Sequence, residues 1–167
     1  MATTQLGENT VHTVGELPET GSHAPDFTLT GIDMADVSKT PGKRTVLNIF
    51  PSIGTGVCQA GVRRFNQLAA GLDNAEVICV SQDLPFAMAS FCEAEGIENV
   101  VVGSAFRSGF GTDYGVTMAD GAWRGLLARS VVVLDEEGTV LHTEITSAIS
   151  VEPDYDAAIA VLNQPLG

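Results

Sequence analysis

An apolar strand that stops at a proline and is followed by an amphipathic helix constrains the fold of this chain more than any other stretch. Residues 45–50 (TVLNIF) are apolar and β-branched, the pattern of a strand buried on both faces of a sheet. Pro51 ends that strand. Apolar residues then recur at steps of three and four, at Val62, Phe65, Leu68, Ala69 and Leu72. This spacing predicts a helix that buries one face, so the chain contains a helix packed against a sheet.

Cys58 lies in the first turn of this predicted helix, and Thr55 is suited to cap it because threonine favours the N-cap position. The backbone N–H groups of a first turn have no partner within the helix, and the positive end of the helix dipole lies beside them. Such a position favours a reactive thiolate. A packed core cysteine also fits the pattern, because free cysteines are among the most buried residues. The residues alone leave both interpretations open.

Strands and helices alternate along the rest of the chain. Strands are predicted at 26–29, 76–81 and 99–103, and a β-hairpin is predicted over 130–145. Helices are predicted at 85–96, which begins with a proline and stops at a glycine, and from residue 152 onward. Residues 10–17 predict a hairpin appended to the main sheet, and the glycine-rich residues 108–115 predict a loop.

This order of elements predicts an α/β protein with a mixed central sheet flanked by helices, the arrangement of a thioredoxin-like fold, with an N-terminal β-hairpin. The length of 167 residues suits one domain that spans residues 1–167. Hydrophobic residues make up 44% of the chain and charged residues only 17%, which indicates a folded protein with a sizeable core.

The charge of the chain excludes several kinds of partner. With 21 acidic and 8 basic residues the net charge is −13, which repels nucleic acid and anionic membrane surfaces. No apolar run is long enough to span a bilayer, and the first ten residues lack the order of a secretion signal. We therefore expect no nucleic acid partner, no membrane association and a cytoplasmic location.

The chain has three cysteines, and structural disulfides are rare in the cytoplasm. Cys58, Cys79 and Cys92 form neither a C-x-x-C pair nor a zinc-binding spacing, which leaves catalysis or redox sensing as their chemical use. Cys79 lies in a predicted buried strand, so we expect an inert core thiol. The local sequence around Cys92 fits a packed helix residue. Arg129 directly precedes a predicted strand, and its local sequence fits a surface cation at the start of that strand.

Pro51, Thr55 and Cys58 match the P-x-x-x-T-x-x-C signature of the peroxiredoxins. Residues 51–66 (PSIGTGVCQAGVRRFN) resemble the thiol peroxidase (Tpx) subfamily, whose members are atypical two-cysteine peroxiredoxins. Four further segments resemble Tpx sequences in the expected order, at residues 81–92, 113–121, 125–138 and 152–162. Gly54 departs from the pattern, because many Tpx sequences carry Asp there, which affects only a local turn contact.

The resemblance implies that Cys58 is the peroxidatic cysteine and Cys92 the resolving cysteine, and that they form an intramolecular disulfide which thioredoxin reopens. It implies that Arg129 lies beside the reactive sulfur, with Thr55 and Pro51 completing the site. Hydrogen peroxide and organic hydroperoxides are the implied substrates, a homodimer is the implied assembly, and no cofactor or metal is required. Because the two cysteines lie on separate predicted helices, we expect both segments to unfold locally before they bond.

Two other functions stay open at this point. A thioredoxin-like disulfide reductase would use a C-x-x-C motif, and its absence argues against that activity. A non-enzymatic redox sensor would use Cys58 and Cys92 as a switch disulfide without turnover. Repeated consumption of peroxide distinguishes the peroxidase from such a sensor.

Overall fold

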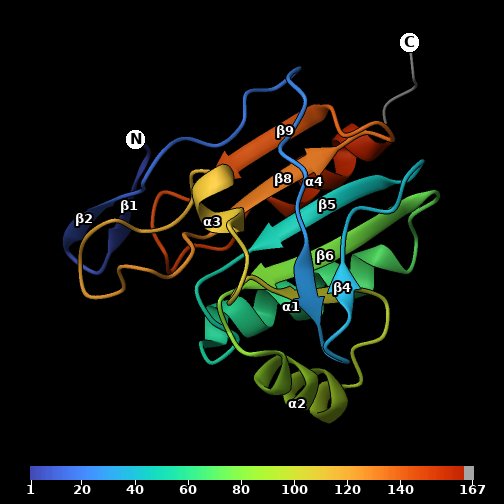
Figure 1. Ribbon diagram of the computed structural model, residues 1–167, viewed down its shortest axis with the longest axis horizontal. Coiled ribbons are helices and arrows are strands. Elements are labelled where there is room, and N and C mark those ends of the chain that lie inside the picture. Colours follow the sequence, from blue (N-terminus) through green and yellow to red (C-terminus); the bar gives the residue numbers. More distant parts are fainter. Residues whose placement is uncertain (164–167) are drawn as a thin grey trace.

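The computed structural model describes residues 1–163, and its main feature is a mixed sheet of seven strands in the order β4-β3-β7-β6-β5-β8-β9 (Figure 1). The strands of this sheet are β3 (Leu29–Gly31), β4 (Asp36–Val37), β5 (Arg44–Ile49), β6 (Ala75–Ser81), β7 (Val101–Ser104), β8 (Ser130–Leu134) and β9 (Val140–Ile145). The helices are α1 (Gly56–Ala69), α2 (Pro85–Glu95), α3 (Phe110–Asp113) and α4 (Tyr155–Leu162). None of these helices, within the described residues, is long and apolar enough to cross a membrane.

The predicted thioredoxin-like α/β fold with a mixed sheet is confirmed. Strand β5 lies inside the sheet, where it pairs in parallel with β6 and antiparallel with β8. The parallel pair β6 and β7 and the antiparallel hairpin β8 and β9 extend the sheet on either side. Parallel strands need a crossover, and α1 and α2 supply the two crossovers. The loop that leads into α1 therefore follows β5 at the middle of the sheet.

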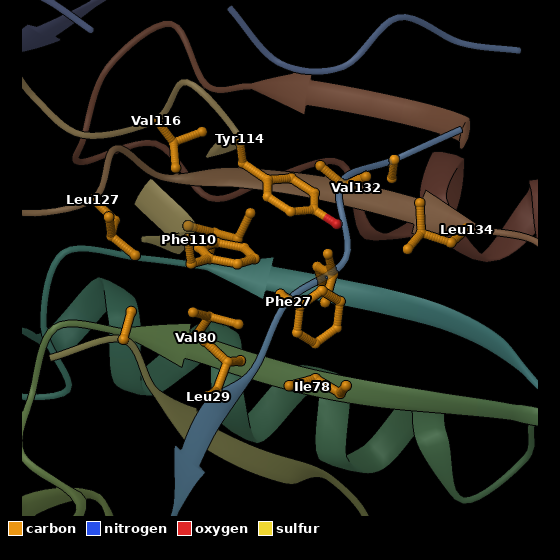
Figure 2. Packing of buried hydrophobic residues seen from close by; sticks show 14 of the residues in the cluster. Phe27, Leu29, Ile78, Val80, Phe110, Tyr114, Val116, Leu127, Val132 and Leu134 are labelled. Atoms are coloured by element: carbon orange, nitrogen blue, oxygen red, sulfur yellow. The ribbon is translucent and has the colours of Figure 1, made fainter. Parts of the chain in front are cut away.

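Side chains of the central strands alternate between two cores, as the pleat of a strand requires. Leu47 and Ile78 point into a core on one face, where the rings of Phe110 and Tyr114 stack with centroids 4.4 Å apart (Figure 2). The neighbouring residues of the same strands point to the opposite face, where a second core forms beneath α1, α2 and α4. Cys58 belongs to this second core.

The N-terminal β-hairpin is present, but its position differs from the prediction. It consists of β1 (Thr3–Leu6) and β2 (Asn9–His12), and these strands form a sheet of their own instead of joining the main sheet. The turn of the hairpin lies at Gly7, whose φ of 62° suits glycine. Because the turn comes this early, the second strand ends at His12 and residues 13–17 lie outside the hairpin. Gln5 accepts a hydrogen bond of 2.8 Å from the N–H of Ile149, which ties β1 to the segment after β9.

Two other local predictions are wrong. The strand predicted at 26–29 begins only at Leu29, because β3 pairs with β7 only at Thr30 and Gly31, and Phe27 instead packs edge-on against Phe110. The loop predicted at 108–115 contains the short helix α3. Gly111 lies in α3 for a packing reason, because a Cβ there would collide with the side chains of Thr117 and Leu127.

The helix predicted at 85–96 is confirmed, and the helix predicted from residue 152 is present but begins at Tyr155. Pro85 is the first residue of α2. Gly96 directly follows the helix and has the left-handed conformation that ends many helices. Asp154 caps α4 by accepting a hydrogen bond of 3.0 Å from the N–H of Ala157. The predicted single domain extends to residue 167, and its last four residues lie outside the described residues.

Candidate active site

Cys58 lies in the first turn of α1, where the chain leaves the middle of the sheet. Its side chain is almost fully buried, with 1% of its surface exposed. Thr55 is the N-cap residue, and its hydroxyl accepts a weak hydrogen bond of 3.4 Å from the N–H of Cys58. The capping predicted from the sequence is therefore present, and the sulfur lies at the positive end of a helix of 14 residues.

Arg129 is the cation that contacts the sulfur of Cys58. A terminal nitrogen of its guanidinium donates a hydrogen bond of 3.2 Å to the Sγ atom of Cys58, and its Nε donates one of 2.8 Å to the carbonyl oxygen of Ile149. Only 2% of Arg129 is exposed. The surface position that its local sequence suggests is thus wrong, because Arg129 directly precedes the buried strand β8 and its guanidinium reaches the sulfur of Cys58 in α1.

A buried guanidinium keeps its charge at every physiological pH, and it is stable only with acceptors around it. The acceptors around Arg129 are the carbonyl oxygen of Ile149 and the sulfur of Cys58. The hydrogen bond to Ile149 also fixes the direction of the guanidinium fork. Arg129 is therefore a rigid, charged hydrogen-bond donor held beside the sulfur of Cys58.

A loop of six residues, 50–55, connects β5 to α1, and Asp83 holds it in place. The carboxylate of Asp83 accepts hydrogen bonds of 2.8 Å from the hydroxyl of Ser52 and 2.6 Å from the N–H of Ile53. The hydroxyl of Ser81 donates to the same carboxylate at 2.6 Å. Pro51, the second residue of the loop, is buried. These contacts fix the backbone immediately before Thr55.

The sequence analysis did not identify Asp83 as a site residue. Its one signal was position, because Asp83 and Pro51 both follow strands that run in parallel and therefore end at the same edge of the sheet. Gly54, the departure from the Tpx pattern, lies in the same loop. A Cβ at Gly54 would meet the hydroxyl of Ser52 at 3.4 Å, an ordinary contact, so this loop has space for a larger residue.

A cavity of about 180 Å³ opens beside Thr55 and Arg129. Its walls are mainly apolar and come from distant parts of the chain, including Leu6 in β1, Trp123 in the loop before β8, and Ile149. The sequence analysis missed this wall, because it depends on the position of the N-terminal hairpin. The cavity gives a small molecule with one polar end a route to the guanidinium of Arg129.

Cys92 lies apart from this constellation, on α2. It is 8% exposed, and burial raises the pKa of its thiol. It lines a groove of about 430 Å³ together with Ile32 in the β3–β4 turn, Ile97 after α2 and Val101 in β7. The three cysteines are all free, so the structure is that of the reduced protein.

Cys79 is a core residue, as predicted. It is completely buried in β6, and this burial raises the pKa of its thiol to about 12, although the side-chain amide of Asn48 donates to the sulfur at 3.6 Å. Its thiol therefore keeps its proton at neutral pH. Residues 1–163 contain no group of three or more His, Cys, Asp and Glu side chains arranged to hold a metal ion.

Comparison with known proteins places these features in a family context. The Redoxin family profile matches residues 19–159. A thiol peroxidase of Corynebacterium glutamicum is 52% identical over 165 residues, which cover 98% of this chain and 100% of the relative. A thiol peroxidase of Mycobacterium tuberculosis is 54% identical over 164 residues, which cover 97% of this chain and 99% of the relative.

Solved structures agree with these sequence relatives. A peroxiredoxin-like protein from Aquifex aeolicus superposes with a TM-score of 0.92 at 35% identity, covering 96% of this chain and 95% of that protein. A thiol peroxidase from Chromobacterium violaceum superposes with a TM-score of 0.88 at 19% identity, covering 96% of this chain and 95% of the other, and supports the fold alone.

Proposed function

The chain belongs to the Redoxin family and is a thiol-dependent peroxidase of the peroxiredoxin type, and we propose that Cys58 and Cys92 carry out its reaction cycle. The resemblance of its sequence to the thiol peroxidase subfamily is confirmed by relatives that match nearly the whole chain. The observation that carries the proposal is the hydrogen bond of 3.2 Å between the buried guanidinium of Arg129 and the sulfur of Cys58.

In the first step the thiolate of Cys58 attacks the distal oxygen of a peroxide. A bond between sulfur and oxygen forms, the O–O bond breaks, and the leaving oxygen departs with a proton as water or an alcohol. Arg129 stabilises the thiolate and the charge that develops on the leaving oxygen. The hydroxyl of Thr55 adds a donor at the helix end, and Pro51 keeps water away from the loop. Sulfur is oxidised to the sulfenic acid.

In the second step the thiol of Cys92 attacks the sulfur of this sulfenic acid, and water leaves as the intramolecular disulfide forms. The two Cα atoms of a disulfide lie within about 4.4 to 6.8 Å of each other, and both sulfurs must face one another. Cys58 lies in the first turn of α1, whereas Cys92 lies on α2 and lines a groove with residues of the β3–β4 turn and β7. Local opening of both segments therefore precedes the second step.

In the third step thioredoxin reduces the disulfide by thiol–disulfide exchange and restores both thiols. We propose both hydrogen peroxide and organic hydroperoxides as substrates. The cavity beside Arg129 supports this range, because Leu6, Trp123 and Ile149 provide an apolar wall for an organic group. A cytoplasmic location agrees with a cycle that depends on a pool of reduced thioredoxin.

A homodimer is the assembly that we propose. Three large apolar side chains are exposed in neighbouring segments: Leu84 by 53%, Phe86 by 67% and Phe106 by 39%. The segments are joined, because the hydroxyl of Ser104 donates a hydrogen bond to the carbonyl oxygen of Asp83. Exposed apolar patches of this kind mark interaction surfaces. Replacing Phe86 by Glu should give a monomer in sedimentation experiments, whereas an unchanged oligomeric state would exclude this surface.

Peroxide consumption with a thioredoxin system tests the proposed cycle. Replacing Cys58 by Ser should abolish turnover, because a serine hydroxyl at this site stays protonated and is a poor nucleophile. Replacing Cys79 by Ser provides the matched control, since it also exchanges a buried sulfur for oxygen but leaves the site intact. Substantial turnover by the Cys58 variant would refute the assignment, and stoichiometric oxidation of the natural protein without turnover would indicate a redox sensor.

A further inference from the structure

Arg63 connects the two helices that carry Cys58 and Cys92. It lies on α1, and its guanidinium donates a hydrogen bond of 2.5 Å to the carboxylate of Glu95 at the end of α2. The same guanidinium lies over the ring of Phe91, 5.6 Å from its centroid. Arg63 thus combines an ion pair and a cation–π contact across the gap between the helices.

These contacts lie on both sides of Cys92 in the sequence. Phe91 directly precedes Cys92, and Glu95 follows it by three residues, almost one helical turn. On α1 the guanidinium also contacts the side chain of Gln59 at 3.5 Å, and Gln59 directly follows Cys58. Arg63 therefore touches residues adjacent to each of the two cysteines without touching either sulfur.

The contacts of Arg63 stabilise the folded form of α2, in which Cys92 is hardly accessible. The hydrogen bond from Arg63 lowers the pKa of Glu95, because it favours the ionised carboxylate. Arg63 and Glu95 have half-exposed side chains, 42% and 37% accessible. Exposed ion pairs and cation–π contacts are individually weak. They consequently shift the balance between closed and open forms of α2, but they do not lock the helix.

We propose that Arg63 is a positioning residue that holds α2 closed and thereby sets the rate at which Cys92 reaches the sulfenic acid of Cys58. This inference rests on the proposed function, because it assumes that Cys92 is the resolving cysteine. In that step the sulfur of Cys92 bonds to the sulfur of Cys58, the S–O bond breaks, and the hydroxyl group leaves as water with the thiol proton.

The rate at which α2 opens determines the fate of the sulfenic acid. While α2 stays closed, a second peroxide molecule can oxidise the sulfenic acid of Cys58 to the sulfinic acid, with release of water or an alcohol. Faster opening of α2 favours the disulfide over this side reaction. Arg63 therefore sets the peroxide concentration at which the enzyme inactivates itself.

Arg63→Ala tests the proposal, and Arg64→Ala is the matched control. Arg64 is the next residue of the same helix and carries the same charge, but it is exposed and forms no hydrogen bond or ion pair within residues 1–163. After one equivalent of peroxide, acid quenching and mass spectrometry follow disulfide formation. Arg63→Ala should form the disulfide about three- to tenfold faster, the size expected for losing one exposed ion pair and one cation–π contact. Arg64→Ala should match the natural protein.

Three further measurements separate this role from a merely structural one. Higher ionic strength should speed disulfide formation in the natural protein but not in Arg63→Ala, because salt screens the ion pair. Arg63→Lys keeps the charge and should restore part of the slow rate. Hydrogen exchange on the reduced proteins should show less protection of residues 86–96 in Arg63→Ala than in Arg64→Ala. This last readout needs no turnover.

Two results would overturn the inference. Equal disulfide rates and equal exchange in Arg63→Ala and Arg64→Ala would show that the contacts of Arg63 do not hold α2. Slower disulfide formation in Arg63→Ala would show that Arg63 guides Cys92 toward Cys58 instead. Cys92→Ser provides the separate test of the proposed function: if it forms the same oxidised products at the same rate, Cys92 is not the resolving cysteine, whatever Arg63 does.

Discussion

The guanidinium of Arg129 is buried between a carbonyl oxygen and a sulfur, and we predict that its removal slows the first oxidation step. Arg129→Ala should react with peroxide about a hundredfold more slowly, the usual effect of removing one preorganised donor from an anionic transition state. Rapid-mixing measurements of Cys58 oxidation test this value. Arg124→Ala, which removes an exposed arginine nearby in the sequence, should leave the rate unchanged. An equal rate in both variants would assign Arg129 a structural role.

A second prediction at this scale concerns Asp83, whose carboxylate accepts hydrogen bonds from Ser52, Ile53 and Ser81. Asp83→Asn places an amide donor against at least one of these donors. We expect a loss of about 1 to 3 kcal/mol in the free energy of unfolding, the cost of leaving such groups unpaired, together with slower oxidation of Cys58. Urea unfolding and rapid mixing measure the two effects. Asp73→Asn alters an exposed carboxylate and is the control.

Some residues of the site could be predicted from the sequence and others could not, because some make contacts with sequence neighbours and others only with distant residues. The motif around Cys58 is local, so the cap by Thr55 follows from residues only three apart. Arg129 was assigned to the site by resemblance alone, because its own neighbours indicate a surface cation. Asp83 was missed because its partner Ser52 lies 31 residues away, and no local pattern indicates that contact.

Among the elements, the strands of the central sheet were predicted well, whereas the position of the N-terminal hairpin and the helix α3 were not. Strands β5, β6 and β8 are buried on both faces, and a continuous apolar run reports that burial directly. The N-terminal hairpin and α3 depend on contacts with distant segments. Phe110 of α3 stacks on Tyr114 and packs edge-on against Phe27. The contact with Phe27 joins distant parts of the chain, so the local sequence does not predict it.

We predict that α2 and the first turn of α1 lose protection when the enzyme is oxidised. Cys58 and Cys92 occupy different surroundings in the reduced structure, and a disulfide requires their Cα atoms to approach. Hydrogen exchange of the reduced and peroxide-treated proteins should show faster exchange at residues 56–60 and 86–96 after oxidation. Strand β6 should exchange equally in both forms. Unchanged protection of the two helical segments would mean that the disulfide forms without local unfolding.

At the scale of the whole molecule, the two cores share one sheet, so we expect residues 1–167 to unfold as a single domain in one transition. Cys79 lies within that sheet, and its ionisation makes the free energy of unfolding depend on pH in the alkaline range. Burial raises the pKa of its thiol from 9.0 to about 12. The unfolded chain therefore loses this proton at a lower pH than the folded protein does. The stabilisation is complete below pH 9.0 and is lost as the pH rises toward 12.

Replacing Cys79 by Ala tests this linkage. Between about pH 8 and pH 10.5, the stability of the natural protein should fall by about 2 kcal/mol more than that of the variant. Urea unfolding under reducing conditions measures both curves, and the comparison cancels the titration of lysines and tyrosines elsewhere. A constant difference between the two proteins across this pH range would mean that Cys79 ionises as readily in the folded protein as in the unfolded chain.

The contact between Arg129 and Ile149 also bears on the order of events during protein synthesis. The ribosome produces Cys58 long before Arg129, and the carbonyl group that orients the guanidinium belongs to a residue made later still. Domains fold as their chains emerge. A nascent chain therefore displays this cysteine without its cation, as an ordinary thiol that reacts slowly with peroxide. The enzyme acquires its sensitivity to oxidants only when the chain as far as Ile149 has been made and folded.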